Sequence, residues 1–170
     1  MKITHCIGLD PGVSGAIAIV SSTLAYVVDI PTRPIRNSNG NIVQVIDLDA
    51  AVTLCREIIG NSPIGLIAFA TEKSSTYNQA ARNAVTAHTP RVAIEAILAT
   101  LGVTQRFQFA PVTWKAAYKL SKNKAQSMAL VQELYPGISL KDRATADRSE
   151  AILIARYGLH VATGQPSTVK

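Results

Sequence analysis

The chain has 170 residues, of which 48% are hydrophobic, and it carries 17 Lys and Arg against 11 Asp and Glu, a formal net charge of +6. With no long Pro, Ser or Gly tract, this composition fits one globular domain with its own core, and the basic excess favours a polyanionic partner without proving one. No segment has the length of a membrane-spanning helix or the pattern of a signal peptide, so we expect a cytoplasmic protein that does not bind a membrane.

Three short apolar stretches open the chain and predict strands. Residues 5–10 and 15–20 are rich in Ile and Val and are separated by a Pro-Gly turn, which predicts a hairpin. Residues 24–30 follow as a third strand. The segment 31–41 is rich in Pro, Asn and Gly and predicts a loop.

Helix and strand then alternate. Asp49 is the expected N-cap of a helix that ends at Gly60, and residues 64–70 form an almost wholly apolar strand, as expected for one buried on both faces. Thr89 is the expected N-cap of a second helix, with a proline at its first position.

The last third of the chain predicts one more strand and three helices. In order, these are a strand over 106–110 and helices over 113–120, 124–135 and 144–157. The residues after His160 are small and polar. We therefore expect one mixed α/β domain over residues 1–160, built around one central sheet, and a flexible C-terminal tail over 161–170.

Four acidic residues stand where they can meet. Asp10 ends the first strand and Glu72 ends the apolar fourth strand, while Asp147 and Glu150 share one face of the last helix. Carboxylates that close together raise one another's pKa unless a cation neutralises them. An all-oxygen ligand set suits Mg²⁺ or Mn²⁺, and two such ions about 3.5–4 Å apart can cleave a phosphodiester. The four acids are the candidate metal ligands and catalytic residues.

Each acid also has an ordinary explanation. Asp10 could be a turn aspartate, and Glu72 could be an exposed charge at a strand end. Asp147 could be an acid that stabilises the helix dipole, and Glu150 could form a surface ion pair with a nearby arginine. No one of the four is specific when taken alone. Their combination carries the hypothesis.

Four segments match, in order, the motifs of one known family. Residues 7–16 read IGLDPGVSGA, Glu72 follows an apolar strand, and residues 146–155 read ADRSEAILIA. The basic segment between them holds, in order, Trp114, Lys115, Lys122 and Lys124. Together these segments resemble the RuvC-type Holliday junction resolvases of the RNase H-like superfamily, and they span nearly the whole chain.

The resemblance implies a fold and an activity. The fold is RNase H-like, with a mixed five-stranded central sheet flanked by helices. The activity is that of a crossover junction endodeoxyribonuclease, a homodimer that resolves four-way DNA junctions by paired cleavage with Mg²⁺ or Mn²⁺, two ions in each site. Glu150 stands where the bacterial enzymes usually carry Asp, which places the chain nearer to phage and chloroplast relatives. A bacterial cell or a phage-infected host is the expected setting.

Basic and aromatic residues supply the candidate DNA contacts. Seven of the 17 basic residues lie between Lys115 and Arg148, and phosphate contact is a reasonable use for such a cluster. The candidates are Lys115, Lys122, Lys124, Arg148 and, as an approximate counterpart of the family's aromatic wedge, Tyr77. Trp114 is expected to be a core or hinge residue. The two cysteines, among apolar neighbours and without metal-ligand spacing, are expected to be buried thiols.

Three other functions compete with junction resolution. One is another RNase H-like nuclease, acting on flaps or on RNA–DNA hybrids. A second is a catalytically inactive DNA-binding relative, against which the presence of all four acids argues. The third is a phosphotransferase of the actin and sugar-kinase superfamily, which needs two such domains and therefore a longer chain.

Overall fold

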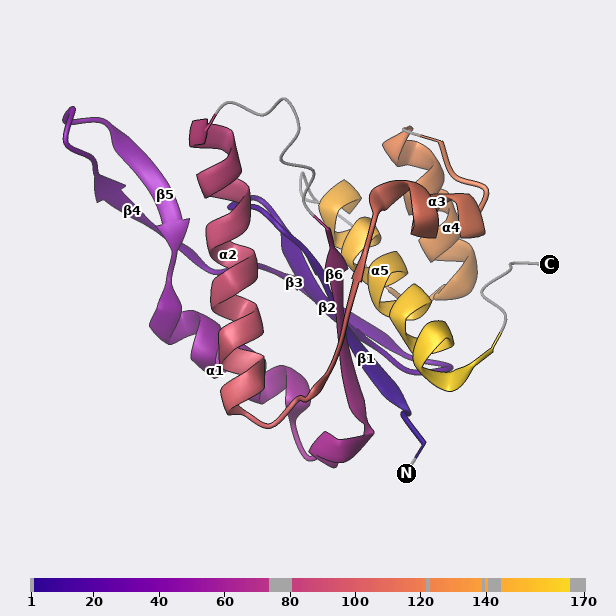
Figure 1. The fold of residues 1–170 in the computed structure, drawn as a ribbon. Coiled ribbons are helices and arrows are strands. Elements are labelled where there is room, and N and C mark those ends of the chain that lie inside the picture. The colour runs from indigo at the N-terminus through magenta and orange to yellow at the C-terminus, as the bar shows by residue number, and fades with distance from the viewer. Residues whose placement is uncertain (1, 74–80, 122, 139, 141–144, 166–170) are drawn as a thin grey trace.

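A mixed sheet forms the centre of the molecule. The computed structural model describes residues 2–73, 81–121, 123–138, 140 and 145–165. Within these ranges, five strands pair in the order β3-β2-β1-β6-β7 (Figure 1). They are β1 (His5–Asp10), β2 (Ala16–Val20), β3 (Ala25–Asp29), β6 (Ile67–Glu72) and β7 (Gln105–Phe109). The first three are antiparallel, while β1, β6 and β7 are parallel, so the predicted mixed five-stranded sheet is confirmed.

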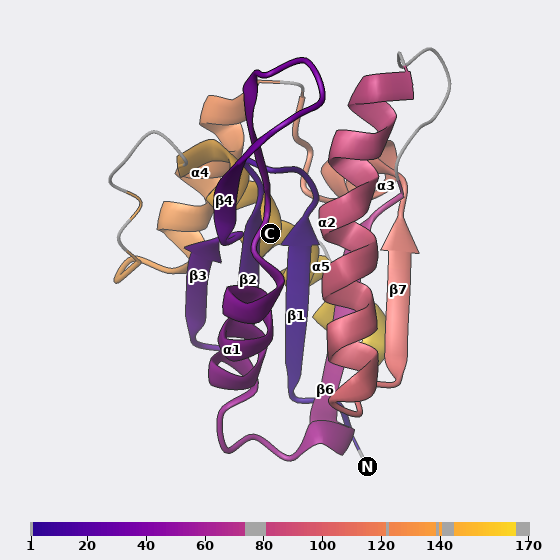
Figure 2. The same cartoon turned by 90° about the vertical axis from the view of Figure 1, so that its left-hand side faces the viewer.

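Helices cover both faces of the sheet. One face carries α1 (Leu48–Ile59) and α2 (Ala81–Thr100), which lie in front of the strands in Figure 2. The other carries α3 (Pro111–Ala117), α4 (Lys124–Leu134) and α5 (Thr145–Thr163) (Figure 1). Large side chains of β1 and β6, such as Ile7, Leu9 and Phe69, point toward α1 and α2. The small ones, such as Cys6 and Ala70, point toward α5. This alternation follows from the two-residue period of a strand.

The small face lets α5 lie directly against the strands. A Cβ added at Gly8 of β1 would be 2.6 Å from the Ala155 Cβ and would overlap the Ala151 carbonyl oxygen. One added at Gly158 of α5 would be 2.6 Å from the Ala70 Cβ. Glycine is therefore required on both sides of this contact, which fixes the height of α5 above the sheet.

Substituting Gly8 by Ala is expected to destabilise the fold and to displace the start of α5. Overpacking a rigid contact of this kind lowers the free energy of unfolding by about 1–3 kcal/mol. Each kcal/mol lowers the melting temperature by about 2–4 °C. Gly65→Ala is the matched control, because nothing lies within 4 Å of a Cβ there. Thermal unfolding of both variants measures the difference. Equal melting temperatures would show that α5 is free to shift on the sheet.

The segment 31–41 differs from its prediction. It was expected to be a loop, but β4 (Thr32–Arg36) and β5 (Ile42–Ile46) form a separate antiparallel hairpin. The composition misled because Pro34 is unfavourable inside a sheet and yet tolerated in a two-stranded ribbon with open edges. The Asn and Gly residues form only the tip, where Asn37 Oδ1 accepts hydrogen bonds from the backbone N–H groups of Asn39 and Asn41, both at 3.0 Å.

Several element boundaries also differ from the prediction. The N-cap of α1 is Asp47, whose side chain accepts from the Ala50 N–H at 3.1 Å, and Asp49 lies in the first turn. Thr89 is not an N-cap, because α2 already begins at Ala81 and contains Pro90. Buried Ile94 and Leu98 hold that helix against the core, which compensates for the hydrogen bond that proline removes.

The remaining boundary shifts are small. A 3-10 turn over Ile64–Leu66 precedes β6, α3 begins at Pro111, and α5 continues past Tyr157 to Thr163. Both cysteines are buried and unpaired, as predicted. In the part of the chain that the structure describes, no helix is long and apolar enough to cross a membrane.

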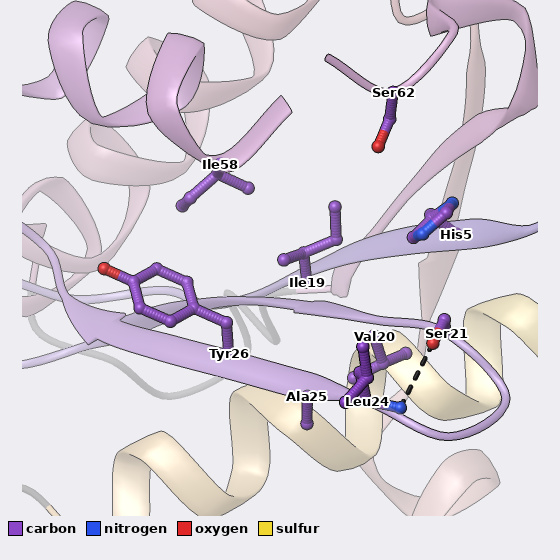
Figure 3. A pocket seen from close by; sticks show the side chains of 9 residues that line it. All are labelled: His5, Ile19, Val20, Ser21, Leu24, Ala25, Tyr26, Ile58 and Ser62. Carbon is purple, nitrogen blue, oxygen red and sulfur yellow. Dashed lines mark hydrogen bonds between the residues drawn. The ribbon is translucent and has the colours of Figure 1, made fainter. Parts of the chain in front are cut away.

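A hollow of about 310 Å³ opens between α1 and the turn joining β2 to β3 (Figure 3). Ile58 of α1 and Tyr26 of β3 line it, and the Ser21 hydroxyl accepts a hydrogen bond from the Leu24 N–H at 3.1 Å beside it. His5, at the start of β1, also lines it. Because Asp10 ends the same strand, the hollow lies at the opposite end of the sheet from the candidate acids.

Candidate functional site

Two of the candidate acids emerge from neighbouring strands at one edge of the sheet. In the parallel pair β1 and β6, Leu9 is in register with Thr71, so Asp10 and Glu72 follow side by side. The buried Thr71 hydroxyl donates to the Leu9 carbonyl at 3.2 Å, which ties the strand ends together. This is the edge at which parallel strands commonly carry a site.

The other two acids come from the first turns of α5. Glu150 immediately precedes Ala151, whose carbonyl oxygen lies against Gly8 of β1, and the residue is only 8% exposed. Asp147, one turn earlier, is partly buried. The close packing of α5 on β1 therefore carries both helix acids to the ends of the strands.

The four acids form one electrostatic cluster around Asp10. Burial raises the pKa of Asp10 well above its usual range, and the charges of Glu72, Glu150 and Asp147 raise it further, whereas Lys124 lowers it. Such a site favours neutralisation of its carboxylates, by protons or by cations. The structure thus brings together all four acids that the sequence singled out.

Glu72 is held by a tryptophan. The Trp114 Nε1–H donates to Glu72 Oε1 at 2.8 Å. Burial raises the pKa of Glu72, while the Trp114 hydrogen bond opposes the rise. Trp114 is fully buried, as predicted, but its role as a donor to the site was missed. The available signal was general: a buried indole N–H usually finds an acceptor.

Two lysines neutralise the helix acids. Lys115 Nζ lies 2.7 Å from Glu150 Oε1 and 5.0 Å from the centre of the Trp114 ring. Lys124 Nζ lies 2.7 Å from Asp147 Oδ1, and this hydrogen bond raises the pKa of the lysine. The expected phosphate contacts of both lysines stay a prediction, and the structure places the two ammonium groups against the acids rather than on a distant surface.

The other candidate DNA contacts lie outside this cluster or outside the described residues. Arg148 donates to both carboxylate oxygens of Asp29, at 2.7 and 2.8 Å. Among the residues that the structure describes, Glu150 does not form the surface ion pair with an arginine that was the alternative explanation for it. The residue is buried and pairs with Lys115. Lys122 and Tyr77 lie outside the described residues.

The donor chemistry suits a hard divalent cation. Four carboxylates face two ammonium groups, so negative charge is in excess, and carboxylate oxygens are the ligands that Mg²⁺ and Mn²⁺ prefer. Among the described residues, however, no three acidic, His or Cys side chains converge tightly enough to hold an ion as they lie. Asp147 and Glu150 each direct an oxygen to a lysine instead. Metal binding by all four acids requires these two side chains to turn toward Asp10 and Glu72.

Solved structures share this fold, although sequence comparison finds no relative. Neither a family model nor a curated protein sequence matches the chain. A structure of Thermus thermophilus RuvC in complex with a Holliday junction substrate superposes with a TM-score of 0.61 at 15% identity, covering 95% of this chain and 96% of that one. A second Thermus thermophilus RuvC structure gives 0.60 at 15%, covering 95% and 97%. At this identity the likeness establishes the RNase H-like fold.

Proposed function

We propose that this protein is a metal-dependent endonuclease that resolves four-way DNA junctions. The observation that carries the proposal is the cluster of Asp10, Glu72, Asp147 and Glu150 at one edge of the sheet, with the pKa of Asp10 raised by burial and by its acidic neighbours. The fold supports it, because a RuvC that binds a Holliday junction substrate has the same architecture over nearly the whole chain. The expected closeness to phage and chloroplast relatives stays a prediction that depends on Glu150.

Each residue of the site has a distinct task in this reaction. Two divalent ions, when bound, would supply Lewis-acid stabilisation of the phosphodiester and a more acidic attacking water. Asp10 and Glu72 would hold these ions from the rigid strand ends, and Trp114 keeps the Glu72 carboxylate in one orientation. Asp147 and Glu150 would complete the ligand set from α5. No side-chain nucleophile is required.

In this proposal the two lysines, Lys115 and Lys124, would bind the phosphate beside the cut. Asp147 and Glu150, which pair with Lys124 and Lys115 in the structure, would instead hold the ions, and this would weaken their pairing with the two lysines. The two ammonium groups would then be available to bind the phosphate beside the cut. Without metal and DNA, the ion pairs Lys115–Glu150 and Lys124–Asp147 would keep the two helix acids neutralised.

Replacing Lys115 and Lys124 together by Ala is expected to weaken junction binding. If each lysine meets one phosphate, the slope of log K against log salt becomes shallower by about 1.5–2 units. Anisotropy titrations over a salt series measure it. Exposed Lys119, replaced by Asn because its φ is 55°, and Lys2, replaced by Gln, remove the same charge elsewhere as the control. A slope equal to wild type would exclude the contacts.

A homodimer is the second part of the proposal. A four-way junction has two-fold symmetry, and a two-fold protein can present one site to each of two opposed strands. An apolar hollow of about 690 Å³ between α2 and the end of β5 supports self-association, since Val92 and Leu48 on its rim are 56% and 55% exposed. Sedimentation is expected to show a dimer on the junction. A monomer both free and bound would rule out paired cleavage by one assembly.

A further inference from the structure

We propose that the β4–β5 hairpin is an arm that binds the phosphate backbone of duplex DNA beside the acid cluster. DNA as the ligand rests on the proposed function. The assignment of this segment to DNA binding goes beyond it and rests on the position, the charge and the construction of the hairpin.

The hairpin leaves the sheet at the level of the acids. Asp10 is in register with Ala16 of β2, and Ala16 is in register with Asp29 of β3. Strands lie about 4.8 Å apart, so the Cα of Asp29 is about 10 Å from that of Asp10. β4 begins at Thr32, soon after Asp29. Both ribbon views place the hairpin tip at the same end of the molecule as the C-terminal ends of β1 and β6 (Figures 1 and 2).

The length of the hairpin suits a contact some distance from the cut. Five residues in each strand, at about 3.3 Å per residue, give the arm a length of roughly 16 Å. Successive phosphates on one strand rise by about 3.4 Å along the duplex axis. The arm therefore reaches phosphates on the order of five base pairs from the acid cluster.

The hairpin carries only positive charge, which suits a phosphate ligand. Residues 30–46 contain Arg33 and Arg36 and no Asp or Glu. Both arginines are exposed, and neither has an acidic partner among the described residues, in contrast to Arg148 on Asp29. Arginine on an extended ribbon presents several N–H donors to phosphate oxygens.

The tip is built to hold its shape. Arg36 donates one N–H to the Gly40 carbonyl at 2.7 Å, which fixes the side chain along the turn while the residue stays exposed. Asn37 closes the turn through its side-chain oxygen. Exposed Ser38, Asn39 and Asn41 add polar groups of the kind that contact phosphate and sugar. An ordered tip loses less conformational entropy on binding than a loop.

The test is DNA binding by Arg33→Gln/Arg36→Gln, made in an Asp10→Asn background so that no substrate is cut. The control is Lys2→Gln/Arg56→Gln, which removes the same charge from exposed residues before β1 and in the last turn of α1, away from the acids. Anisotropy with a labelled junction over a salt series gives the affinity and its salt slope. A second substrate carries neutral methylphosphonates three to eight base pairs from the cut, a window chosen around the roughly five expected.

The arm variant is expected to bind on the order of ten- to sixty-fold more weakly at about 0.1 M salt, with a slope shallower by about 1.8, and to be insensitive to the methylphosphonates. The control should behave like the parent. Equal slopes for parent and arm variant, or no DNA binding by the parent, would overturn the proposal that the hairpin binds DNA.

If Ile42→Ser, at a residue that is 67% exposed, abolishes dimerisation while the arginine variant binds DNA normally, the hairpin contacts a second copy of the chain instead. Cleavage by the wild-type protein is measured separately. If the wild type does not cut the junction but the arm variant still binds DNA more weakly, the nuclease proposal is contradicted and the arm proposal stands.

Discussion

Asp10→Asn and Glu72→Gln are each expected to abolish measurable junction cleavage and to leave junction binding largely intact. Both carboxylates sit at strand ends where they would hold the metal ions, and the ions supply several kcal/mol of transition-state stabilisation. That corresponds to at least about a hundred-fold loss of rate for each variant. Single-turnover cleavage in Mg²⁺ measures it. A variant that cuts at a rate near wild type would show that its carboxylate is not a ligand.

The same Asp10 variant is expected to melt at a higher temperature than wild type in the absence of metal. The folded-state pKa of Asp10 is raised above its unfolded value, so the folded protein binds more protons between the two values. Stability therefore falls as the pH rises through that window, and Asn removes this loss. Melting curves in a chelator from about pH 4 to about pH 8 test the sign, with exposed Asp49→Asn as the control. A large drop in melting temperature would favour a purely structural role for Asp10.

Glu150 is expected to be needed at its full length. Its carboxylate extends from a helix held in place by Gly8 and contacts Lys115 at 2.7 Å. Glu150→Asp withdraws the ligand by one methylene and should lose substantial activity. Glu150→Gln should lose more, because a neutral amide binds Mg²⁺ poorly. Single-turnover cleavage over a titration with Mg²⁺ and with Mn²⁺ gives the order.

Stability separates the catalytic from the structural role of Glu150. Glu150→Gln removes the carboxylate that pairs with the partly buried Lys115 at 2.7 Å, so the melting temperature of the variant should fall. Adding Lys115→Met should restore stability without restoring cleavage. Wild-type rates and metal dependence in Glu150→Gln would identify Glu150 as an acid outside the reaction and leave a site of Asp10, Glu72 and Asp147.

The central sheet and the four acids were predictable because each depends on local pattern. Short apolar runs mark β1 and β6 as buried strands, and Asp10 and Glu72 stand where those runs stop. Asp147 and Glu150 precede a run of buried small and apolar residues that has to pack on the sheet. Convergence of the acids then follows from topology.

The hairpin and the ion pairs were not predictable in the same way. Pro34 and the Asn-rich tip have the composition of a loop, and only the pairing of β4 with β5 shows a ribbon. Lys115 comes from α3 and Lys124 from α4, so their partners depend on how separate helices dock on α5. The sequence marked both lysines as candidate DNA contacts, which stays a prediction, but it did not indicate the acids that they neutralise.

The central claim is that the acid cluster cuts branched DNA, and cleavage of a substrate panel tests it most directly. End-labelled four-way junction, flap, RNA–DNA hybrid and linear duplex are incubated with wild-type protein and Mg²⁺ or Mn²⁺, with Asp10→Asn in parallel. The account predicts paired, symmetric nicks in the junction, little cleavage of the other substrates, and none by the variant. Preferential cleavage of the flap or the hybrid, or a junction left intact by wild type at saturating metal, would contradict it.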